Sequence, residues 1–290
     1  MRSTHTSVLL DEVAENLIQP DYRLLVDTTI GGGGHTYTIL LNYPNLRAVG
    51  MDIDEVALAL AREQLAPFQD RVTLKRGNFS ELKQILGDEG ISAVDAVLFD
   101  LGVSSYQLEG GRGFSFKDEQ ELDMRMDQRE EMTAYHVVNT YSYEELRKIM
   151  VDFGEEYKAA QIARAIVNER KKAPIETASA LGSLVARVKR RKGKIHPATQ
   201  TFQAIRMEVN QEIKNLERGL AAAIELLAPG GRVGVISFHS LEDRLVKTCF
   251  KTSPALAVVT KKPIRPGRAE LLHNPRSRSA KLRIAEKVER

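Results

Sequence analysis

Cysteine is almost absent from this sequence of 290 residues: Cys249 stands alone, so no internal disulfide can form. So little cysteine is typical of a reducing compartment and indicates a cytoplasmic protein. Long apolar runs are also missing, since none approaches the roughly 20 residues of a transmembrane helix, and Met1–Leu10 lacks the apolar centre of a signal peptide. The histidines are scattered singly, which predicts no metal site. These absences leave a protein of one large or two modest domains that has no disulfide framework and no contact with a membrane.

Positive charge is concentrated in two segments, although the whole chain carries only +3. Lys261–Arg290 contains ten Lys or Arg against three Glu, a local charge of +7, so the remainder of the chain carries −4. Arg187–Lys194 adds six Lys or Arg within eight residues. Such clusters are usually solvated surface, but two of them on an otherwise acidic chain favour a phosphate-rich partner.

The first hundred residues alternate between strand and helix patterns. The predicted strands are Leu24–Ile30, Arg47–Asp52, Val72–Gly77 and Ala93–Leu101. The predicted helices are His35–Asn42, Asp54–Leu65 and Ser80–Leu86. This alternation is typical of an α/β fold with a parallel sheet and right-handed crossovers, which binds its ligand at the carboxyl ends of the strands. The residues expected at those ends are Asp27, Asp52, Phe79 and Asp100.

From Tyr143 onward the pattern becomes helical. The predicted helices are Tyr143–Val151, Tyr157–Arg170, Thr177–Arg190 and one long or two tandem helices over Phe202–Leu227, which Pro229–Gly231 ends. Strand patterns return at Arg232–Phe238, Ala255–Thr260 and Arg278–Ala285, with a helix at Leu241–Lys251. We therefore predict a mostly parallel, doubly wound sheet built from residues 1–104 and 216–290, with an inserted all-helical domain at 105–215.

A glycine-rich turn follows the first predicted strand. Asp27 lies at the end of the apolar run, and Gly31–Gly34 lead into the next helix. Glycine tolerates positive φ and lets a ligand approach bare backbone, so the turn suits an anionic or nucleotide-like group at a helix N-terminus. Asp52 ends the next strand about 20 residues on, where an acidic side chain commonly accepts hydrogen bonds from a ribose. Together the two features indicate a cofactor that contains adenosine.

The turn does not match the fingerprint of dinucleotide-binding proteins. GxGxxG would need a third glycine where the sequence has Thr36, and that glycine allows close helix–strand packing. S-adenosylmethionine (AdoMet) fits better, because it has no phosphate, its ribose needs an acid such as Asp52, and its adenine can stack on Phe79. Simpler interpretations stay open. The glycines could form a turn without ligand, Asp52 could be an ordinary N-cap of the following helix, for which its neighbour Asp54 is also well placed, and Phe79 could belong to the core.

Longer motifs run in order along nearly the whole chain. They are HTSVLLDE at His5–Glu12, VDTTIGGGGHT at Val26–Thr36, DLGVSSYQL at Asp100–Leu108, RGFSF at Arg112–Phe116, LDMRMD at Leu122–Asp127, FGEE at Phe153–Glu156, HPATQTFQAIRMEVN at His196–Asn210, ISFHSLEDRLVK at Ile236–Lys247 and NPRSRSAKLR at Asn274–Arg283. In these motifs the sequence resembles the RsmH (MraW) family, AdoMet-dependent methyltransferases that modify N4 of a cytidine in bacterial small-subunit ribosomal RNA (rRNA).

The resemblance implies a Rossmann-like class I methyltransferase fold and a cytoplasmic enzyme that methylates a cytidine in the decoding region of 16S rRNA. Its substrate is the rRNA within the small ribosomal subunit or an assembly intermediate, and the enzyme is a monomer or a homodimer. The methyl donor is AdoMet, and methyl transfer of this type needs no metal.

The family's cofactor contacts map onto Gly33, Gly34, His35, Asp52, Phe79, Asp100 and Gln107. The sequence departs from the family pattern in three places: Gly32 replaces the usual Arg, Tyr106 the usual Pro, and Gln120–Glu121 the usual Gly-Pro. None of these departures removes a mapped contact, although Tyr106 adjoins Gln107.

Asp100 is the candidate catalytic residue. The exocyclic amine of cytosine is a poor nucleophile, because its lone pair is delocalised into the ring. A hydrogen-bond acceptor on its N–H localises that pair and takes up the developing positive charge. Our hypothesis is that Asp100 orients the amine, the cofactor or both; the alternative is that it only holds the cofactor and the following loop.

The remaining predictions concern RNA. Ser237–Ser240 ends a predicted strand and should lie beside Asp100, where His239 contacts the base or a phosphate or, alternatively, is only structural. Arg112, Arg187–Lys194 and the tail from Lys261 are the candidates for phosphate contacts. Two other functions stay open: a nicotinamide oxidoreductase, and a ribosome-assembly or RNA-binding module without catalytic activity.

Overall fold

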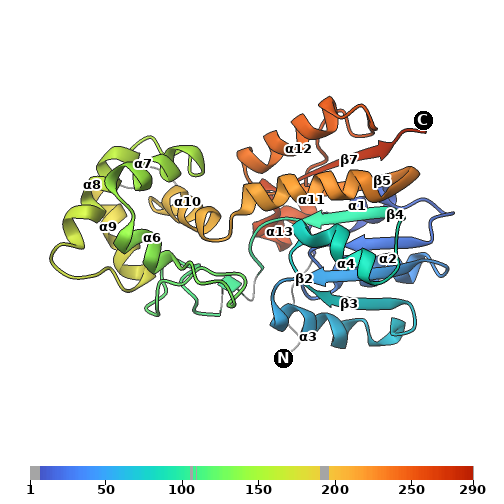
Figure 1. The fold of residues 1–290 in the computed structure, drawn as a ribbon, viewed down its shortest axis with the longest axis horizontal. Helices are drawn as coiled ribbons and strands as arrows, with labels where there is room; N and C mark the ends of the chain where they lie inside the picture. Colours follow the sequence, from blue (N-terminus) through green and yellow to red (C-terminus); the bar gives the residue numbers. More distant parts are fainter. Residues whose placement is uncertain (1–6, 105–106, 109, 190–195, 290) are drawn as a thin grey trace. The chain divides into compact units, whose positions relative to one another are not determined.

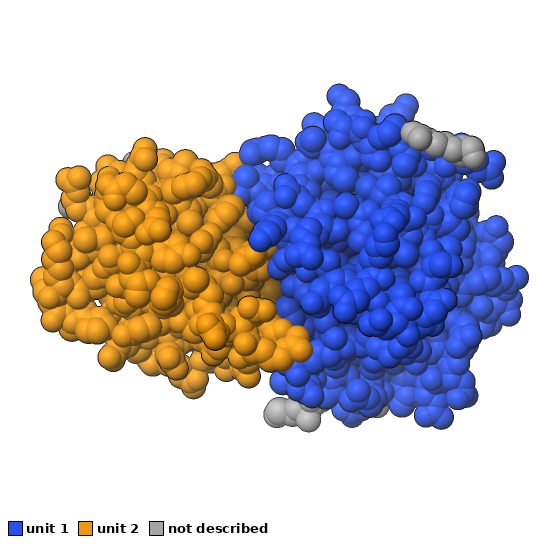
Figure 2. Space-filling model, viewed as in Figure 1, with its two compact units in different colours: residues 1–102, 213–290 blue, residues 103–212 orange. Residues whose placement is uncertain are grey.

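The computed structural model describes residues 7–104, 107–108, 110–189 and 196–289. The chain forms two compact units, residues 1–102 with 213–290 and residues 103–212 (Figure 2). The functional domains that the sequence predicts, divided at residues 105 and 215, stay a prediction. Each unit is described by itself below.

The first unit is built on a mixed sheet of seven strands in the order β3-β2-β1-β4-β5-β7-β6 (Figure 1). The strands are β1 Leu24–Asp27, β2 Arg47–Asp52, β3 Val72–Arg76, β4 Val94–Asp100, β5 Leu227–Ser237, β6 Leu256–Val258 and β7 Lys281–Lys287. Strands β1 to β5 pair in parallel, whereas β7 is antiparallel to both β5 and β6. The predicted α/β fold with a mostly parallel sheet is therefore confirmed.

Helices cover both faces of this sheet. They are α1 Leu10–Leu17, α2 Gly34–Asn42, α3 Glu55–Gln64, α4 Leu82–Asp88, α11 Glu212–Leu226, α12 Ser240–Thr252 and α13 Arg268–His273. Successive side chains of a strand point to opposite faces. In β4, Ala96 and Leu98 pack with the apolar side chains of α1 and α2, whereas Val97 and Phe99 pack with those of α4, α11 and α12. Strand β4 is consequently apolar without interruption, because both of its faces are buried.

Several helix and strand boundaries differ from the sequence prediction, and two places in the second half of the chain show why. The apolar stripe over Phe202–Leu227 forms two helices, because the chain breaks at Gln211, whose φ is 46°. Strand β5 begins at Leu227 and not at Arg232, so the prediction that Pro229 precedes the strand is wrong. Leu227 pairs with Val94 and Arg232 with Ala96, so the residues between them bulge out of the ladder. A bulge is one of the few places in a sheet that tolerates proline.

The described residues of the second unit form a bundle of helices with its own core. Its helices are α6 Ala134–Thr140, α7 Tyr143–Asp152, α8 Ala159–Glu169, α9 Ala178–Val188 and α10 Thr199–Val209. Thr133, Ser142 and Thr177 cap α6, α7 and α9 with side-chain oxygens, which satisfies backbone donors that would otherwise lack a partner. The core consists of residues from these helices and from the loop before them, such as Leu122 and Met124. Among the described residues of both units, no helix combines the length and the apolar character that crossing a bilayer requires.

Candidate functional site

Three acidic residues end neighbouring parallel strands of the first unit. Asp27 ends β1, Asp52 ends β2 and Asp100 ends β4, and β1 lies between the other two strands. Phe79 follows β3 and begins a short 3₁₀ helix, Phe79–Glu81. The structure therefore brings the four strand-end residues of the sequence prediction to one edge of the sheet. The chain reverses its strand order between β1 and β4, which is where open α/β sheets bind ligands.

The glycine turn lies at this edge and is tightly packed. Gly33 is the N-cap of α2 in a left-handed conformation, with φ of 85°. A Cβ atom on Gly33 would lie 3.1 Å from the Leu65 side chain, and one on Gly34 would lie 2.2 Å from the Ser7 hydroxyl oxygen. Glycine is thus required by the backbone conformation at Gly33 and by the close neighbour at Gly34.

Asp52 holds the glycine turn. Its Oδ2 accepts a hydrogen bond of 2.9 Å from the Gly31 amide, and its Oδ1 accepts one of 2.9 Å from the Asp54 amide. Asp54 itself caps α3 by accepting from the Val56 amide at 3.0 Å, so the helix N-cap is Asp54 and not Asp52. Burial raises the pKa of Asp52 to about 6. A carboxylate has about four lone-pair sites, so Asp52 keeps acceptor capacity for a donor such as a ribose hydroxyl.

Asp27 and Asp100 are linked through Thr29. The Asp100 amide donates to the Thr29 hydroxyl at 2.6 Å, and the Thr29 amide donates to Asp27 Oδ1 at 3.3 Å. Asp27 is buried, and its Oδ2 accepts from the Thr36 hydroxyl at 2.8 Å. Burial raises the pKa of Asp27 to about 6, with a further rise from the charge of Asp52. Both acids therefore lie in one hydrogen-bonded segment at the strand ends.

Asp100 is the least compensated of these acids. Its Oδ1 is buried and has no hydrogen-bond partner among the described residues. Its Oδ2 lies 3.8 Å from His35 Nδ1, too far for a hydrogen bond. Burial, followed by the charges of Asp27 and Glu242, raises the pKa of Asp100 well above its ordinary value. Among the described residues, Asp100 Oδ1 therefore remains an unpaired acceptor, or a protonated oxygen without an acceptor.

His35 joins the buried environment of Asp100. Its Nε2 lies 2.9 Å from the Val8 carbonyl oxygen, which can only accept a hydrogen bond. Nε2 therefore carries the hydrogen, and Nδ1 faces Asp100 with a lone pair while the ring is neutral. The structure places His35 with the strand-end acids, as expected of a residue mapped onto the cofactor site.

Phe79 and Gln107 have different surroundings. Phe79 is half-buried and packs edge to face against Phe99, with ring centroids 5.6 Å apart. Gln107 belongs to the second unit, where its Oε1 accepts from the Ser104 amide at 3.0 Å and its own amide donates to the Ser104 hydroxyl at 3.2 Å. Their predicted contacts with the cofactor stay predictions. Tyr106, the departure that adjoins Gln107, lies outside the described residues.

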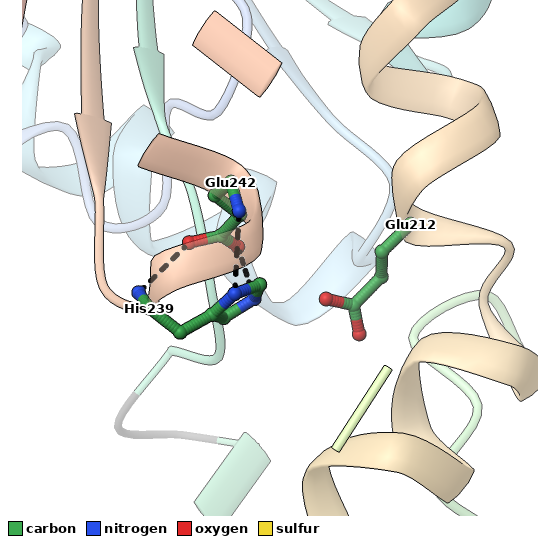
Figure 3. Close-up of side chains that lie close together, drawn as sticks. All are labelled: Glu212, His239 and Glu242. Atoms are coloured by element: carbon green, nitrogen blue, oxygen red, sulfur yellow. Dashed lines mark hydrogen bonds and ion pairs between the residues drawn. The ribbon is translucent and has the colours of Figure 1, made fainter. Parts of the chain in front are cut away.

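Glu242, which is not among the residues predicted from the sequence, organises the end of β5. Its Oε2 accepts from the amides of Phe238 at 2.8 Å and His239 at 3.3 Å, and its Oε1 lies 3.0 Å from His239 Nε2 (Figure 3). His239 is the N-cap of α12 and forms a capping box with Glu242. Ile236 pairs with Asp100 in the sheet, so this turn lies beside Asp100. The spacing of His239 and Glu242 was a usable signal, since a Glu three residues after a cap is typical of a helix start.

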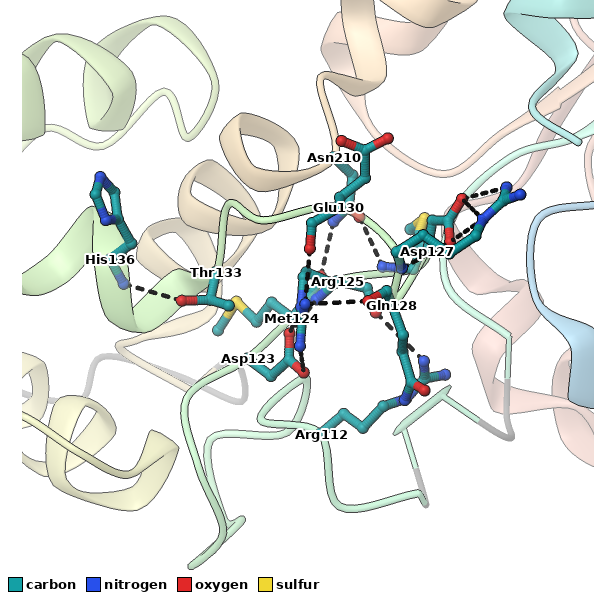
Figure 4. Close-up of polar contacts among 12 residues, drawn as sticks. Arg112, Asp123, Met124, Arg125, Asp127, Gln128, Glu130, Thr133, His136 and Asn210 are labelled. Carbon is teal, nitrogen blue, oxygen red and sulfur yellow. Dashed lines mark hydrogen bonds and ion pairs between the residues drawn. The ribbon is translucent and has the colours of Figure 1, made fainter.

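In the second unit, the LDMRMD motif forms a loop that is held by polar contacts (Figure 4). Arg125 binds Asp123 through Nε and Nη2 and also donates to the carbonyl oxygens of Gln128 and Glu130. The Asn210 side chain accepts from the Met126 amide at 2.7 Å and donates to the Met124 carbonyl at 2.8 Å. Met124, with φ of 59°, is therefore fixed in an unfavourable conformation by contacts on both sides.

Some of the basic residues that are predicted to contact RNA instead bind other residues of this protein. In Arg187–Lys194, Lys189 binds the buried Glu156 at 2.7 Å, and residues 190–194 lie outside the described residues. In the tail, Lys281 and Arg283 both bind Asp243, at 2.9 and 2.7 Å. Arg112 donates to the Arg125 carbonyl at 3.3 Å. Several charges counted in the sequence therefore serve the fold, and the remaining ones carry the prediction of RNA contact.

Comparison with known proteins gives a consistent result over the whole chain. The sequence model described as the MraW methylase family matches residues 2–288. A protein named ribosomal RNA small subunit methyltransferase H from Sulfurihydrogenibium sp. (strain YO3AOP1) is 48% identical over 290 residues, which cover 98% of this chain and 99% of that protein. Proteins of the same name from Persephonella marina and Desulfotalea psychrophila are also 48% identical, each covering 98% of this chain and 99% and 98% of their own lengths.

Proposed function

The chain belongs to the MraW methylase family, and from this premise we propose that it transfers a methyl group from AdoMet to N4 of a cytidine in bacterial 16S rRNA. The observation that carries the proposal is the row of Asp27, Asp52 and Asp100 at the ends of three neighbouring strands, beside a glycine turn. The family supports the reaction, and the row of acids supports a positively charged, ribose-containing donor.

The residues present fit AdoMet. Asp52 retains acceptor capacity for ribose hydroxyls, and the glycine turn at Gly33 and Gly34 carries no side chain that the amino acid end of the ligand would have to displace. The buried Oδ1 of Asp100 has no partner among the described residues and supplies a negative charge or an acceptor for the ligand. When bound, AdoMet supplies an electrophilic methyl group on a sulfonium.

Asp100 acts on the amine in this proposal. Its Oδ1 accepts an N–H of the cytosine amine, which localises the nitrogen lone pair and orients it for attack. The reaction produces one proton as the amine becomes methylated, and the raised pKa of Asp100 suits a group that accepts this proton. Asp27 and Thr29 hold the Asp100 backbone in position for this role.

The substrate in this proposal is 16S rRNA within the small ribosomal subunit or its assembly intermediate. The target base must leave its stack to reach the strand ends, which suits a loop or single-stranded segment. Arg112, Arg187 and the tail from Lys261 are proposed to contact phosphates, and the second unit is proposed to recognise the RNA. We further propose a cytoplasmic enzyme that acts as a monomer or homodimer and needs no metal for the chemistry.

The decisive experiment is methyl transfer from radiolabelled AdoMet to small subunits that lack the modification, followed by identification of the nucleoside. We expect N4-methylated cytidine from the wild type and at least about a hundredfold lower turnover from Asp100→Asn, because the amide is a weaker acceptor that takes up no proton. Wild-type turnover in Asp100→Asn would contradict only the catalytic role of Asp100 and would leave the proposed reaction intact. Label in another nucleoside would contradict the proposed substrate.

Calorimetry separates the remaining alternatives. An RNA-binding module without catalytic activity would give no heat with AdoMet, and a nicotinamide oxidoreductase would bind NADH, which is seen by fluorescence. A third result is also informative: the protein binds AdoMet and methylates small subunits but not naked rRNA. The substrate would then be the rRNA within the particle.

A further inference from the structure

The acids at the strand ends form a cluster of negative charge that lacks a Lys or Arg partner among the described residues. Neither Asp27 nor Asp100 has a Lys or Arg of the described residues within ion-pair distance, and Thr29 links the Asp27 carboxylate to the backbone amide of Asp100. The titratable groups that face Asp100 are Asp27 from β1, His35 from α2 and Glu242 from α12. Asp27 in turn feels the charge of Asp52 from β2. Three of these four neighbours carry negative charge when they are ionised.

A buried carboxylate that lacks a hydrogen-bond partner ionises less readily than an exposed one, and other carboxylates nearby make its ionisation harder still. The Oδ1 of Asp100 is such a group among the described residues. We propose that Asp100 holds a proton in the protein without AdoMet, and that binding of the positively charged sulfonium displaces this proton. The spent product, S-adenosylhomocysteine, carries a neutral thioether at the same place and leaves the proton bound. The site therefore distinguishes donor from product by charge, in addition to shape.

This inference rests on the proposed function and adds to it a way to distinguish donor from product by charge. The methyl group makes the donor cationic, and its removal abolishes the charge that competes with the proton. Asp100 then recovers a proton in each cycle, and the reaction supplies one when the amine is methylated. The net charge of the site together with its ligand is therefore the same before and after transfer. Because the product is neutral, no ion pair hinders its release.

Proton occupancy also follows from the neighbours of Asp100. Burial is the main cause of its raised pKa, and the charges of Asp27 and Glu242 add to it. Asp27 accepts hydrogen bonds from the Thr29 amide and the Thr36 hydroxyl, which favour its ionised form, whereas the buried Oδ1 of Asp100 has no donor among the described residues, so the proposed proton belongs to Asp100. Asn at position 100 keeps the shape of the side chain but carries neither the charge nor the proton, which makes Asp100→Asn the informative variant.

The test is isothermal titration calorimetry at pH 7 in buffers that differ in enthalpy of ionisation. We expect AdoMet to release close to one proton more from the wild type than from Asp100→Asn, whereas S-adenosylhomocysteine releases the same number from both. The amino acid group of each ligand titrates equally in both proteins, so the difference isolates Asp100. The matched control is Asp88→Asn, the same substitution at an exposed position at the end of α4, and it should behave as the wild type.

A second measurement keeps the inference testable if Asp100→Asn folds or binds poorly. In the wild type, the ratio of the dissociation constants of S-adenosylhomocysteine and AdoMet should rise between pH 6 and pH 7.5, by up to about tenfold per pH unit for release of one proton. A ratio that stays flat overturns the inference. Equal proton release from the wild type and Asp100→Asn, with both binding AdoMet, overturns it as well and leaves the proposed function intact. Absence of heat with either ligand contradicts the proposed function itself.

Discussion

The two units of the molecule differ in how they treat buried carboxylates. In the second unit, Glu156 binds Lys189 at 2.7 Å and Asp127 binds Arg129 at 2.6 Å. At the strand ends of the first unit, Asp27 and Asp100 have hydroxyl, amide and histidine neighbours, and no basic residue of the described chain pairs with either. Burial of an unpaired charge is costly, so the unpaired acids of the first unit require a reason other than stability.

The difference follows the place in the fold and not the unit as a whole. Asp243 also belongs to the first unit, and there Lys281 and Arg283 neutralise it. Uncompensated acids thus occur where the sheet topology predicts a ligand, and compensated acids occur where the chain packs on itself. A buried acid alone is therefore a weak indicator of a ligand site, and a buried acid without a partner is a better one.

The largest effect is expected for Glu156→Ala, which breaks a compensated pair. Lys189 would lose a partner whose side chain is completely buried, so we expect a loss of about 3 kcal/mol in the free energy of unfolding. Urea denaturation measures this loss. The control is Glu169→Ala, which removes an exposed ion pair with Lys172 and should cost less than about 0.5 kcal/mol. Equal losses from the two variants would show that burial does not distinguish these pairs.

A smaller effect, on binding, is expected for Asp52→Asn. The amide cannot accept as strongly from ribose hydroxyls and from the Gly31 amide, so AdoMet affinity should fall roughly 30-fold, about 2 kcal/mol. Calorimetric titration measures the affinity. Asp54→Asn is the matched control two residues away, because Asn caps a helix as well as Asp does and should leave the affinity unchanged. Equal affinities in the two variants would mean that Asp52 does not hold the ribose.

The smallest effect, of opposite sign, is expected for Asp27→Asn. The pKa of Asp27 is raised from 3.8 to about 6 in the folded protein, so the ionised form costs stability above pH 6, and this cost disappears as the pH falls toward 4. Removing the charge should therefore stabilise the protein without AdoMet by about 1–2 kcal/mol at pH 8 and by less at pH 5. Urea denaturation at both pH values measures this gain. A gain that is the same at pH 5 and pH 8 would contradict a destabilising charge at Asp27.

Much of the first unit could be predicted from the sequence, because its elements are local patterns. Strand β2 has the predicted bounds, and β4 is recognisable as an apolar run between two turns. The start of β5 was missed, since proline and glycine ordinarily end an element and only pairing with Val94 shows that the strand continues through them. The roles of Lys189 and Glu242 were also missed, because their partners are found only in the folded chain.

The sequence by itself determined the alternation of strands and helices, the position of the glycine turn and the acids that end the strands, because periodicity and turn chemistry act over a few residues. Only the tertiary structure decided which of the charged residues are neutralised. Asp243 and Glu156 are paired and Asp27 and Asp100 are not, although all four are acids in one sequence. The reason is physical: the ionisation of a carboxylate depends on burial and on charges a few ångströms away, and both are set by segments that are distant along the chain.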